Sequence, residues 1–249
     1  MVASASADGY GARMALETGS ESLRFGMAGA FRSADVEAGA MDFTVESLSL
    51  DLYAGWRSSG GLFVNGVVGL ADDNYSDITR QTTLAAVQAE GKTEGMTTGA
   101  KVQAGTWFDM GGLRLSPRAA VSWVSTEIDG YNEDSVAASY EYAGRTVESV
   151  SGEVALRLEG DLSDSFGFYA EGGYRDELDD STEAVSVGLR NNSAQDILTD
   201  VETPFGQSLL LNAGIEGKMG PIGVSVGYRG RFADALDSHM ATIGLKVSF

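Results

Sequence analysis

The sequence predicts an all-β protein, an antiparallel up-and-down β-barrel that spans a membrane, and three observations lead to that fold class. Apolar residues recur at every second position in eleven runs, which is the period of a β-strand. The Arg and Lys residues of those runs take the opposite face. Aromatic residues gather on the apolar face, many near the ends of the runs, as in the girdles of outer-membrane barrels. No run of about 18 apolar residues occurs, which excludes a membrane-spanning helix.

The eleven predicted strands fill the chain as one domain, residues 1–249, with turn residues between them. Their ranges are 8–17, 22–32, 44–57, 62–71, 95–109, 113–127, 147–160, 166–175, 207–219, 221–232 and 239–249. Each is assigned from its alternating apolar residues, which are, in chain order, Tyr10, Ala12, Met14 and Leu16; Leu23, Phe25, Met27 and Phe31; Leu48, Leu50, Leu52, Ala54 and Trp56; Leu62, Val64, Val68 and Leu70; Met96, Ala100, Val102, Ala104 and Phe108; Leu113, Leu115, Ala119, Val121 and Trp123; Val154, Leu156 and Leu158; Phe166, Phe168 and Tyr174; Leu209, Leu211, Ala213, Ile215 and Met219; Ile222, Val224, Val226, Tyr228 and Phe232; and Ala241, Ile243, Leu245, Val247 and Phe249.

The polar face of these strands carries the basic residues. Because Arg or Lys on a lipid-facing position costs about 2–4 kcal/mol at the bilayer midplane, this face is expected to line a water-filled lumen. A soluble barrel with the apolar face inside would show the same alternation, and the aromatic girdles favour the membrane barrel. Four other cations, Arg80, Lys92, Arg145 and Arg190, are expected in loops. The predicted lumen-lining charges are Arg13, Arg24, Arg32, Asp51, Arg57, Lys101, Arg114, Arg118, Arg157, Glu171, Arg175, Glu216, Lys218, Arg229, Arg231 and Lys246.

Composition argues against several other classes of function. The net charge of −19 argues against a nucleic-acid partner, because phosphate binding needs clustered Lys and Arg. The chain has no Cys and a single histidine, His239, and it lacks a G-x-S-x-G motif, so no catalytic residue is expected. The acidic stretches "DDNYSD" and "DELDDSTE" lack the spacing of an EF-hand loop and are interpreted as solvated loops. We therefore expect no enzyme activity, cofactor or metal.

One stretch resembles a family signature. The segment "GGLRLSPRAAVSWVSTEIDGYNE" is similar to the signature of the autotransporter β-domain, the translocator of type V secretion, especially in proteins with esterase-type passengers. There a Pro precedes an alternating segment that ends in Asp-Gly-Phe-x-Glu. Pro117, Asp129, Gly130 and Glu133 match, and Tyr131 replaces the Phe.

The resemblance implies an outer-membrane barrel of a Gram-negative bacterium that anchors an upstream passenger and takes part in its secretion, with a helix threaded through the lumen. It implies that Glu133 faces the lumen near that helix; an exposed loop carboxylate is the alternative. The lumenal cations either hold the helix or balance lumenal carboxylates, and the balance is favoured for most of them. A stand-alone outer-membrane channel remains the alternative function.

The end of the chain resembles the signal by which the barrel-assembly machinery recognises outer-membrane proteins. Its residues are Ile243, Leu245, Val247 and Phe249. If the end is periplasmic, short connections at residues 220, 161–165, 110–112, 58–61 and 18–21 fall inside, and long ones at 233–237, 176–206, 128–146, 72–94 and 33–43 fall outside, as outer-membrane barrels require. The segment "TEAVSVGLRNN" is then an arm of an outer loop. Since such barrels have an even number of strands, we expect twelve, of which the first strand and the lumenal helix are not in this sequence.

Overall fold

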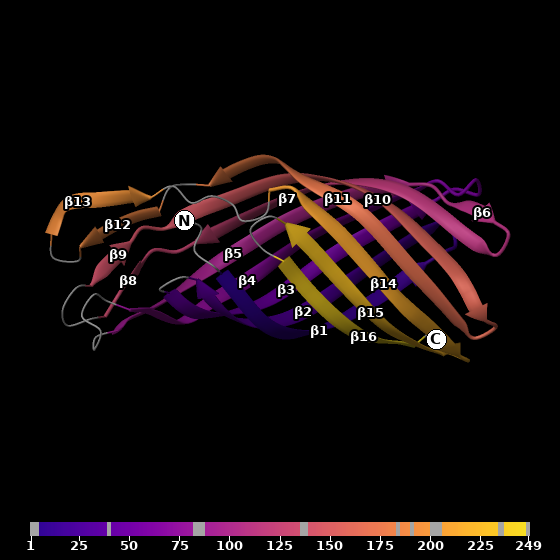
Figure 1. Cartoon of the computed structure of the whole chain (residues 1–249), viewed down its shortest axis with the longest axis horizontal. Coiled ribbons are helices and arrows are strands. Elements are labelled where there is room, and N and C mark those ends of the chain that lie inside the picture. Colours follow the sequence, from indigo (N-terminus) through magenta and orange to yellow (C-terminus); the bar gives the residue numbers. More distant parts are fainter. Residues whose placement is uncertain are drawn as a thin grey trace.

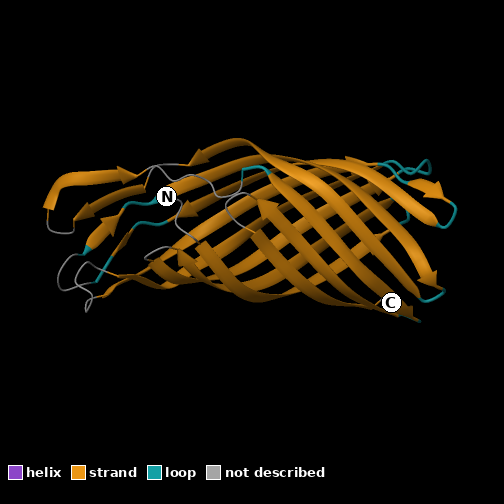
Figure 2. Cartoon of the chain, viewed as in Figure 1, coloured by secondary structure: helices purple, strands orange, loops and turns teal. Residues whose placement is uncertain are grey.

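The computed structural model describes residues 5–38, 41–81, 88–134, 139–182, 185–189, 192–199, 206–233 and 237–247. These residues form strands joined by turns (Figure 2), and none of them belongs to a helix long and apolar enough to cross a membrane. The strands of the main sheet are β1 (Ala5–Gly19), β2 (Leu23–Ala38), β3 (Met41–Arg57), β4 (Phe63–Gln81), β5 (Gln88–Gly105), β6 (Phe108–Met110), β7 (Leu113–Ile128), β10 (Arg145–Ser163), β11 (Phe166–Thr182), β14 (Ser208–Met219), β15 (Ile222–Ala233) and β16 (Asp237–Val247).

Eleven long strands form one curled antiparallel sheet, as the alternation predicts (Figure 1). Their order follows the chain, and the short strand β6 pairs only with β7. Within the described residues β1 pairs only with β2, and β16 only with β15. With an odd number of strands in up-and-down order, β1 and β16 run in the same direction.

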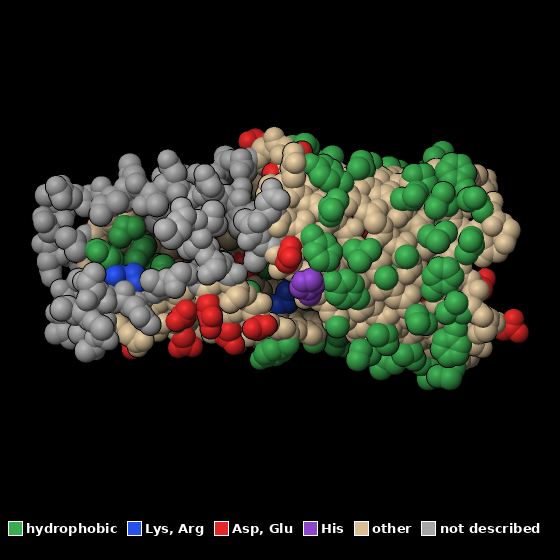
Figure 3. Space-filling model, viewed as in Figure 1, with side chains coloured by type: hydrophobic (Ala, Val, Ile, Leu, Met, Phe, Trp, Pro, Cys, Tyr) green, Lys and Arg blue, Asp and Glu red, His purple; other side chains and the backbone are tan. Residues whose placement is uncertain are grey.

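The apolar residues of the alternation form a belt around the outside of the sheet. Met14 and Ile243 are each 83% exposed, and Leu156 is 49% exposed. In the space-filling view the apolar side chains of the belt are spread over the right half of the visible face, and a row of acidic side chains lies along the lower edge of the left half (Figure 3). Few large apolar side chains are buried among the described residues, and most of those on the strands are exposed on the outer face.

Several strands continue past this belt at the end where the long connections lie, so the predicted strand ends there were wrong. Pairing between β4 and β5 reaches Gln81 opposite Gln88, and Arg80 and Lys92 therefore lie in strands, contrary to the prediction that they lie in loops. Arg145 is the first residue of β10, and Arg190 lies outside the described residues. The alternation ends with the belt because water solvates both faces of a strand beyond it.

A second sheet stands at this outer end of the molecule. It consists of β8 (Tyr131–Asn132), β9 (Tyr140–Tyr142), β12 (Val185–Leu189) and β13 (Asn192–Thr199), in the order β13-β12-β9-β8. A bridge between Glu90 and Asp134 joins it to β5, so it extends the wall of the main sheet (Figure 1). The predicted outer arm at "TEAVSVGLRNN" contains β12, which belongs to this outer sheet and not to the main sheet.

Candidate functional site

Charged residues line the inner face of the sheet, and ion pairs join them along one strand, between adjacent strands or across one intervening strand. The ladder carries this face from strand to strand: Glu171 of β11 lies opposite Asn212 of β14, which lies opposite Arg229 of β15. The N–O distances of the pairs are 3.3 Å for Arg13–Asp51, 3.6 Å for Arg24–Glu17, 2.9 Å for Lys101–Glu153, 2.7 Å for Arg114–Glu159, 3.0 Å for Arg118–Glu171, 2.6 Å for Arg157–Glu159, 3.6 Å for Arg175–Glu177 and 3.8 Å for Arg231–Glu177.

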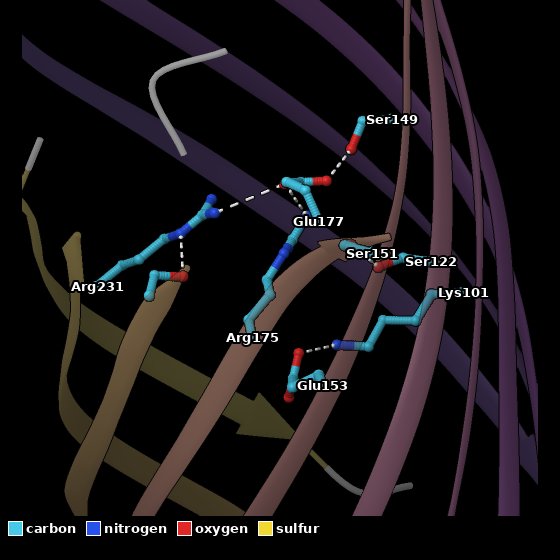
Figure 4. A network of polar contacts seen from close by, with 9 residues as sticks. Lys101, Ser122, Ser149, Ser151, Glu153, Arg175, Glu177 and Arg231 are labelled. Atoms are coloured by element: carbon cyan, nitrogen blue, oxygen red, sulfur yellow. Dashed lines mark hydrogen bonds and ion pairs between the residues drawn. The ribbon is translucent and has the colours of Figure 1, made fainter. Parts of the chain in front are cut away.

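Part of this wall, from β5 to β15, carries separate groups of polar contacts (Figure 4). Lys101 reaches Glu153, the Ser122 and Ser151 hydroxyls lie 3.0 Å apart, and Glu177 accepts a hydrogen bond from Ser149. Sequence reasoning missed Glu177 because the strand was predicted to end at residue 175, whereas β11 continues to Thr182.

The predicted lumen-lining residues divide into two groups. Ten of the predicted lumen charges take part in the ion pairs above, so a carboxylate balances each of those cations. The remaining residues have no ion-pair partner within the ranges that the structure describes; they are Arg32, Arg57, Glu216, Lys218, Arg229 and Lys246.

The signature proline lies where the ladder between β5 and β7 is interrupted. Pro117 cannot donate a backbone hydrogen bond, and its carbonyl accepts one from the N–H of Thr106. Because the N–H and C=O of one residue in an antiparallel strand point to the same neighbour, the missing donor faces the break between β5 and β6. A central strand can therefore accommodate this Pro without losing a ladder bond.

The same interruption turns Trp107 toward the inner cations. The guanidinium of Arg114 lies 5.2 Å from the centre of the Trp107 ring, and that of Arg118 lies 5.5 Å from it. The backbone N–H of Trp107 donates a hydrogen bond to the carbonyl of Gly61. The φ of Gly61 is 89°, which favours glycine. Such cation–π contacts stabilise a site by about 0.5–1 kcal/mol each. Sequence reasoning missed Trp107 because it breaks the alternation.

Gly130 of the signature lies where the wall passes from the main sheet to the outer sheet. A Cβ atom on Gly130 would lie 2.9 Å from the backbone nitrogen of Gly144 and 2.9 Å from the carbonyl oxygen of Tyr142. Backbone atoms leave no room for a side chain there. The backbone of Asp129 fixes the same point. Its N–H donates a hydrogen bond to the backbone carbonyl of Glu94, and its carbonyl accepts one from the Thr93 hydroxyl.

Glu133 is buried in a cluster that joins β4 to the outer sheet. Its side chain is 1% exposed and accepts two hydrogen bonds from Arg80, of 2.8 and 2.7 Å. It also accepts bonds from the Tyr140 N–H at 3.0 Å and the Tyr142 hydroxyl at 3.2 Å. The alternative prediction, an exposed loop carboxylate, was wrong, because the two-pronged guanidinium and three tyrosines enclose the group.

Aromatic rings complete this signature cluster, which comprises Arg80, Tyr131, Glu133, Tyr140 and Tyr142. Tyr131 and Tyr142 stack with ring centres 4.5 Å apart, and the Arg80 guanidinium lies 4.2 Å above the Tyr140 ring. The hydrogen bonds that Arg80 donates to Glu133 raise the pKa of Arg80, and burial raises the pKa of Tyr131. Arg80 was not predicted to take part, because 53 residues separate it from Glu133.

The residues of the predicted assembly signal lie on β16 as far as the structure describes it. Ile243, Leu245 and Val247 are exposed on the outer face at 83%, 77% and 61%. Phe249 lies outside the described residues. These three side chains continue the apolar belt along the strand that forms one edge of the sheet.

No group of three His, Cys, Asp or Glu residues among the described residues could hold a metal ion. His239 is on the outer face, with its Nδ1 2.7 Å from the Tyr228 hydroxyl and its ring edge against Phe232.

Comparison with known proteins agrees with this geometry. The translocator domain of the autotransporter NalP from Neisseria meningitidis has a similar fold, with a TM-score of 0.81 and 16% identity over 98% of this chain and 82% of that chain. The β-domain of the Bordetella autotransporter BrkA gives 0.69 and 16% over 98% and 91%. The transport unit of AIDA-I from Escherichia coli gives 0.71 and 15% over 98% and 84%.

These identities are low and the structures therefore show the fold alone. A search of curated proteins finds no match. The model of the autotransporter beta-domain family, however, matches residues 2–230, which is most of the chain. The chain belongs to the autotransporter β-domain family.

Proposed function

We propose that this chain passes its passenger through the polar inner face of the sheet, and that the signature cluster fixes the outer sheet over the exit. The family makes the chain an outer-membrane translocator for a passenger domain. The observation that carries the proposal is the arrangement of Arg80 and Glu133: a buried, two-pronged ion pair that joins β4 to the outer sheet.

The polar inner face supports a path for an extended or helical chain. A wall of paired charges and hydroxyls keeps water against the passing backbone, so its N–H and C=O groups are not stranded without partners. A stand-alone outer-membrane channel or porin-like barrel, the alternative function, would not need an outer sheet attached to one side of the exit.

The outer edges of β1 and β16, which have no partner strand among the residues that the structure describes, support a twelfth strand between them. These two strands run in the same direction, so a single added strand can pair antiparallel with both, which an even-stranded barrel requires. Unpaired backbone groups at membrane depth cost several kcal/mol each. In this proposal the added strand and a lumenal helix come from the segment that joins passenger to translocator.

The outer belt supports contact with lipid, and β16 supports recognition by the barrel-assembly machinery. The exposed aliphatic side chains of the belt would be unfavourable in water at about 25 cal/mol per Å². Ile243, Leu245 and Val247 present such side chains on an edge strand. We also propose that the chain itself catalyses no reaction, since His239 contacts only Tyr228 and Phe232 in the interactions described above.

Surface display of a passenger tests the proposal. An epitope-tagged passenger is joined upstream of the chain in two forms, one through a segment that supplies an amphipathic strand and one through a flexible linker. In a Gram-negative host, antibody binding to intact cells is expected for the first form and at a much lower level for the second. No display from either form would refute the translocator proposal, and equal display would refute the added strand.

A further inference from the structure

Strand β4 contains a β-bulge where it leaves the apolar belt. Between the pairs Tyr75–Thr93 and Ile78–Gly91, β4 has two residues where β5 has one. The register of β4 against β3 shifts at the same place, so one residue of β4 is extra. Asp77 lies at this point with a φ of 51°, and among the residues that the structure describes it is the one non-glycine residue with a positive φ.

The bulge changes which residues of β4 face inward. Below it the odd-numbered residues do so: Asp73 is 6% exposed and accepts hydrogen bonds from inward hydroxyls of β3 and β5. Above it the even-numbered residues take that face, since Ile78 is 6% exposed and Arg80 reaches Glu133. Successive residues of a regular strand point to opposite faces. The change from odd to even therefore requires the extra residue of a bulge.

The signature cluster depends on this change of face. If residues 76–81 continued as a regular strand, Ile78 and Arg80 would point outward, and Glu133 would lose both hydrogen bonds from the guanidinium. Ile78 also supports the cluster. A Cβ atom on Gly91 would lie 2.6 Å from the Tyr131 ring and 3.8 Å from the Cβ of Ile78, so the ring lies over Gly91 beside Ile78.

The residue type at the bulge fits its backbone. The side chain of Asp77 is exposed, so burial does not explain the residue. A φ of 51° lies in the left-handed region, which Gly, Asn and Asp adopt more readily than other residues and which β-branched residues strongly disfavour. Asp77 thus allows the chain to leave the regular strand for one residue and to return to it in the opposite phase.

We propose that Asp77 is a positioning residue of this translocator: its left-handed backbone forms the bulge that turns Arg80 inward, and Arg80 then holds Glu133 and the outer sheet. Asp77 acts through its backbone conformation and not through its carboxylate. The inference rests on the proposed function and adds a residue that lies 40 positions before the signature proline, Pro117.

Hydrogen exchange of the Tyr140 amide in the full chain, folded in detergent, tests the proposal, because this amide donates to Glu133. Asp77→Val should speed exchange about tenfold, since a β-branched residue disfavours a positive φ. Asp77→Gly keeps this conformation accessible and should not speed exchange. Asn74→Val is the matched control: Asn74 is exposed in the regular part of β4, and exchange should stay within about twofold.

Deletion of Asp77 separates the change of face from any other role of this residue. The deletion removes the extra residue, so β4 becomes regular while Ile78 still pairs with Gly91 and Arg80 still faces inward. Exchange at Tyr140 should then stay within about threefold of the wild type, a smaller effect than that of Asp77→Val. If the carboxylate or the bend of the bulge were itself required, the deletion would be the more damaging change.

Arg80→Ala sets the level expected when the cluster is lost, about a hundredfold faster exchange. A protected Tyr140 amide in Asp77→Val, or a deletion variant that exchanges as fast as Arg80→Ala, would overturn the proposal. Heat-dependent mobility in SDS gels shows that the main sheet of each variant is folded.

Passenger display distinguishes this failure from failure of the proposed function. If the wild-type chain displays its passenger while exchange does not follow the expected order, the chain is a translocator in which Asp77 does not position Arg80. If exchange follows the order while display is equal in all variants, Asp77 positions Arg80 as proposed, and the outer sheet is not needed for display.

Discussion

Replacing Glu133 with Ala should loosen the outer sheet while leaving the main sheet intact. The carboxylate is 1% exposed and Arg80 is 16% exposed, so the change leaves a largely buried guanidinium and the Tyr140 N–H without their acceptor. Removing one partner of a buried ion pair costs about 3–5 kcal/mol. The main sheet does not depend on these contacts, because its ladders are continuous below them.

The measurement is hydrogen exchange of the Tyr140 amide in the detergent-folded protein. At about 1.4 kcal/mol for each factor of ten, the lost stability should speed exchange by at least a hundredfold. Glu133→Gln keeps an acceptor of the same shape and loses the charge, and it should cost about 1–3 kcal/mol, with a correspondingly smaller effect. Passenger display should slow in the same order.

Glu141→Ala is the matched control, since Glu141 follows Tyr140 on strand β9 and its side chain is exposed. It should leave exchange at Tyr140 unchanged. If Glu133→Ala also left that amide protected, the signature cluster would not hold the outer sheet and the assigned role of Glu133 would be refuted.

Three further predictions follow from the same geometry. Gly130→Ala should make the outer sheet sensitive to protease, because the added Cβ meets backbone atoms at 2.9 Å. Gly172→Ala is the control and should not do so, because nothing lies within 4 Å of its added Cβ. Equal digestion of the two variants would count against the close approach at Gly130. Burial raises the pKa of Tyr131 above its ordinary 10.0, so the contribution of Tyr131 to stability is complete below pH 10 and is lost as the pH rises beyond it. Tyrosinate absorbance should therefore appear together with protease sensitivity of the outer sheet. Ionisation of Tyr131 at pH 10 while the outer sheet stays protected from protease would contradict this. Folding should require detergent or lipid and give a species whose SDS-gel mobility changes on heating; a stable monomer in buffer alone would contradict the outward belt.

The sequence was sufficient to predict the main sheet because the belt imposes a strict pattern. Each outward position at belt depth is apolar or small, and each cation takes the other face, so eleven strands could be counted from alternation alone. The outward exposure of Leu156 and Ile243 follows from that pattern. The cations take the inner face because a charge on a lipid-facing position is costly.

The outer extension could not be predicted in this way. Beyond the belt both faces of a strand meet water, so Arg80 and Lys92 carry no periodic signal and were assigned to loops. The Arg80–Glu133 pair depends on a contact between distant parts of the chain, which no local pattern encodes. A usable signal did exist: the alternation of Tyr140, Glu141 and Tyr142 in an outer connection is typical of a short strand with an aromatic face.

The two ends of the family signature have a common physical basis, since each marks a place where the regular ladder stops. At Pro117 the interruption between β5 and β6 removes the need for a donor and turns Trp107 onto Arg114 and Arg118. At Gly130 the wall passes from β7 to the outer sheet, and only a residue without a side chain allows the backbone to approach Gly144. A regular barrel strand would tolerate many residues at either position. The residues of the predicted signature therefore lie where the chain departs from a plain barrel, with an aromatic–cation cluster at one end of β7 and an anchored outer sheet at the other.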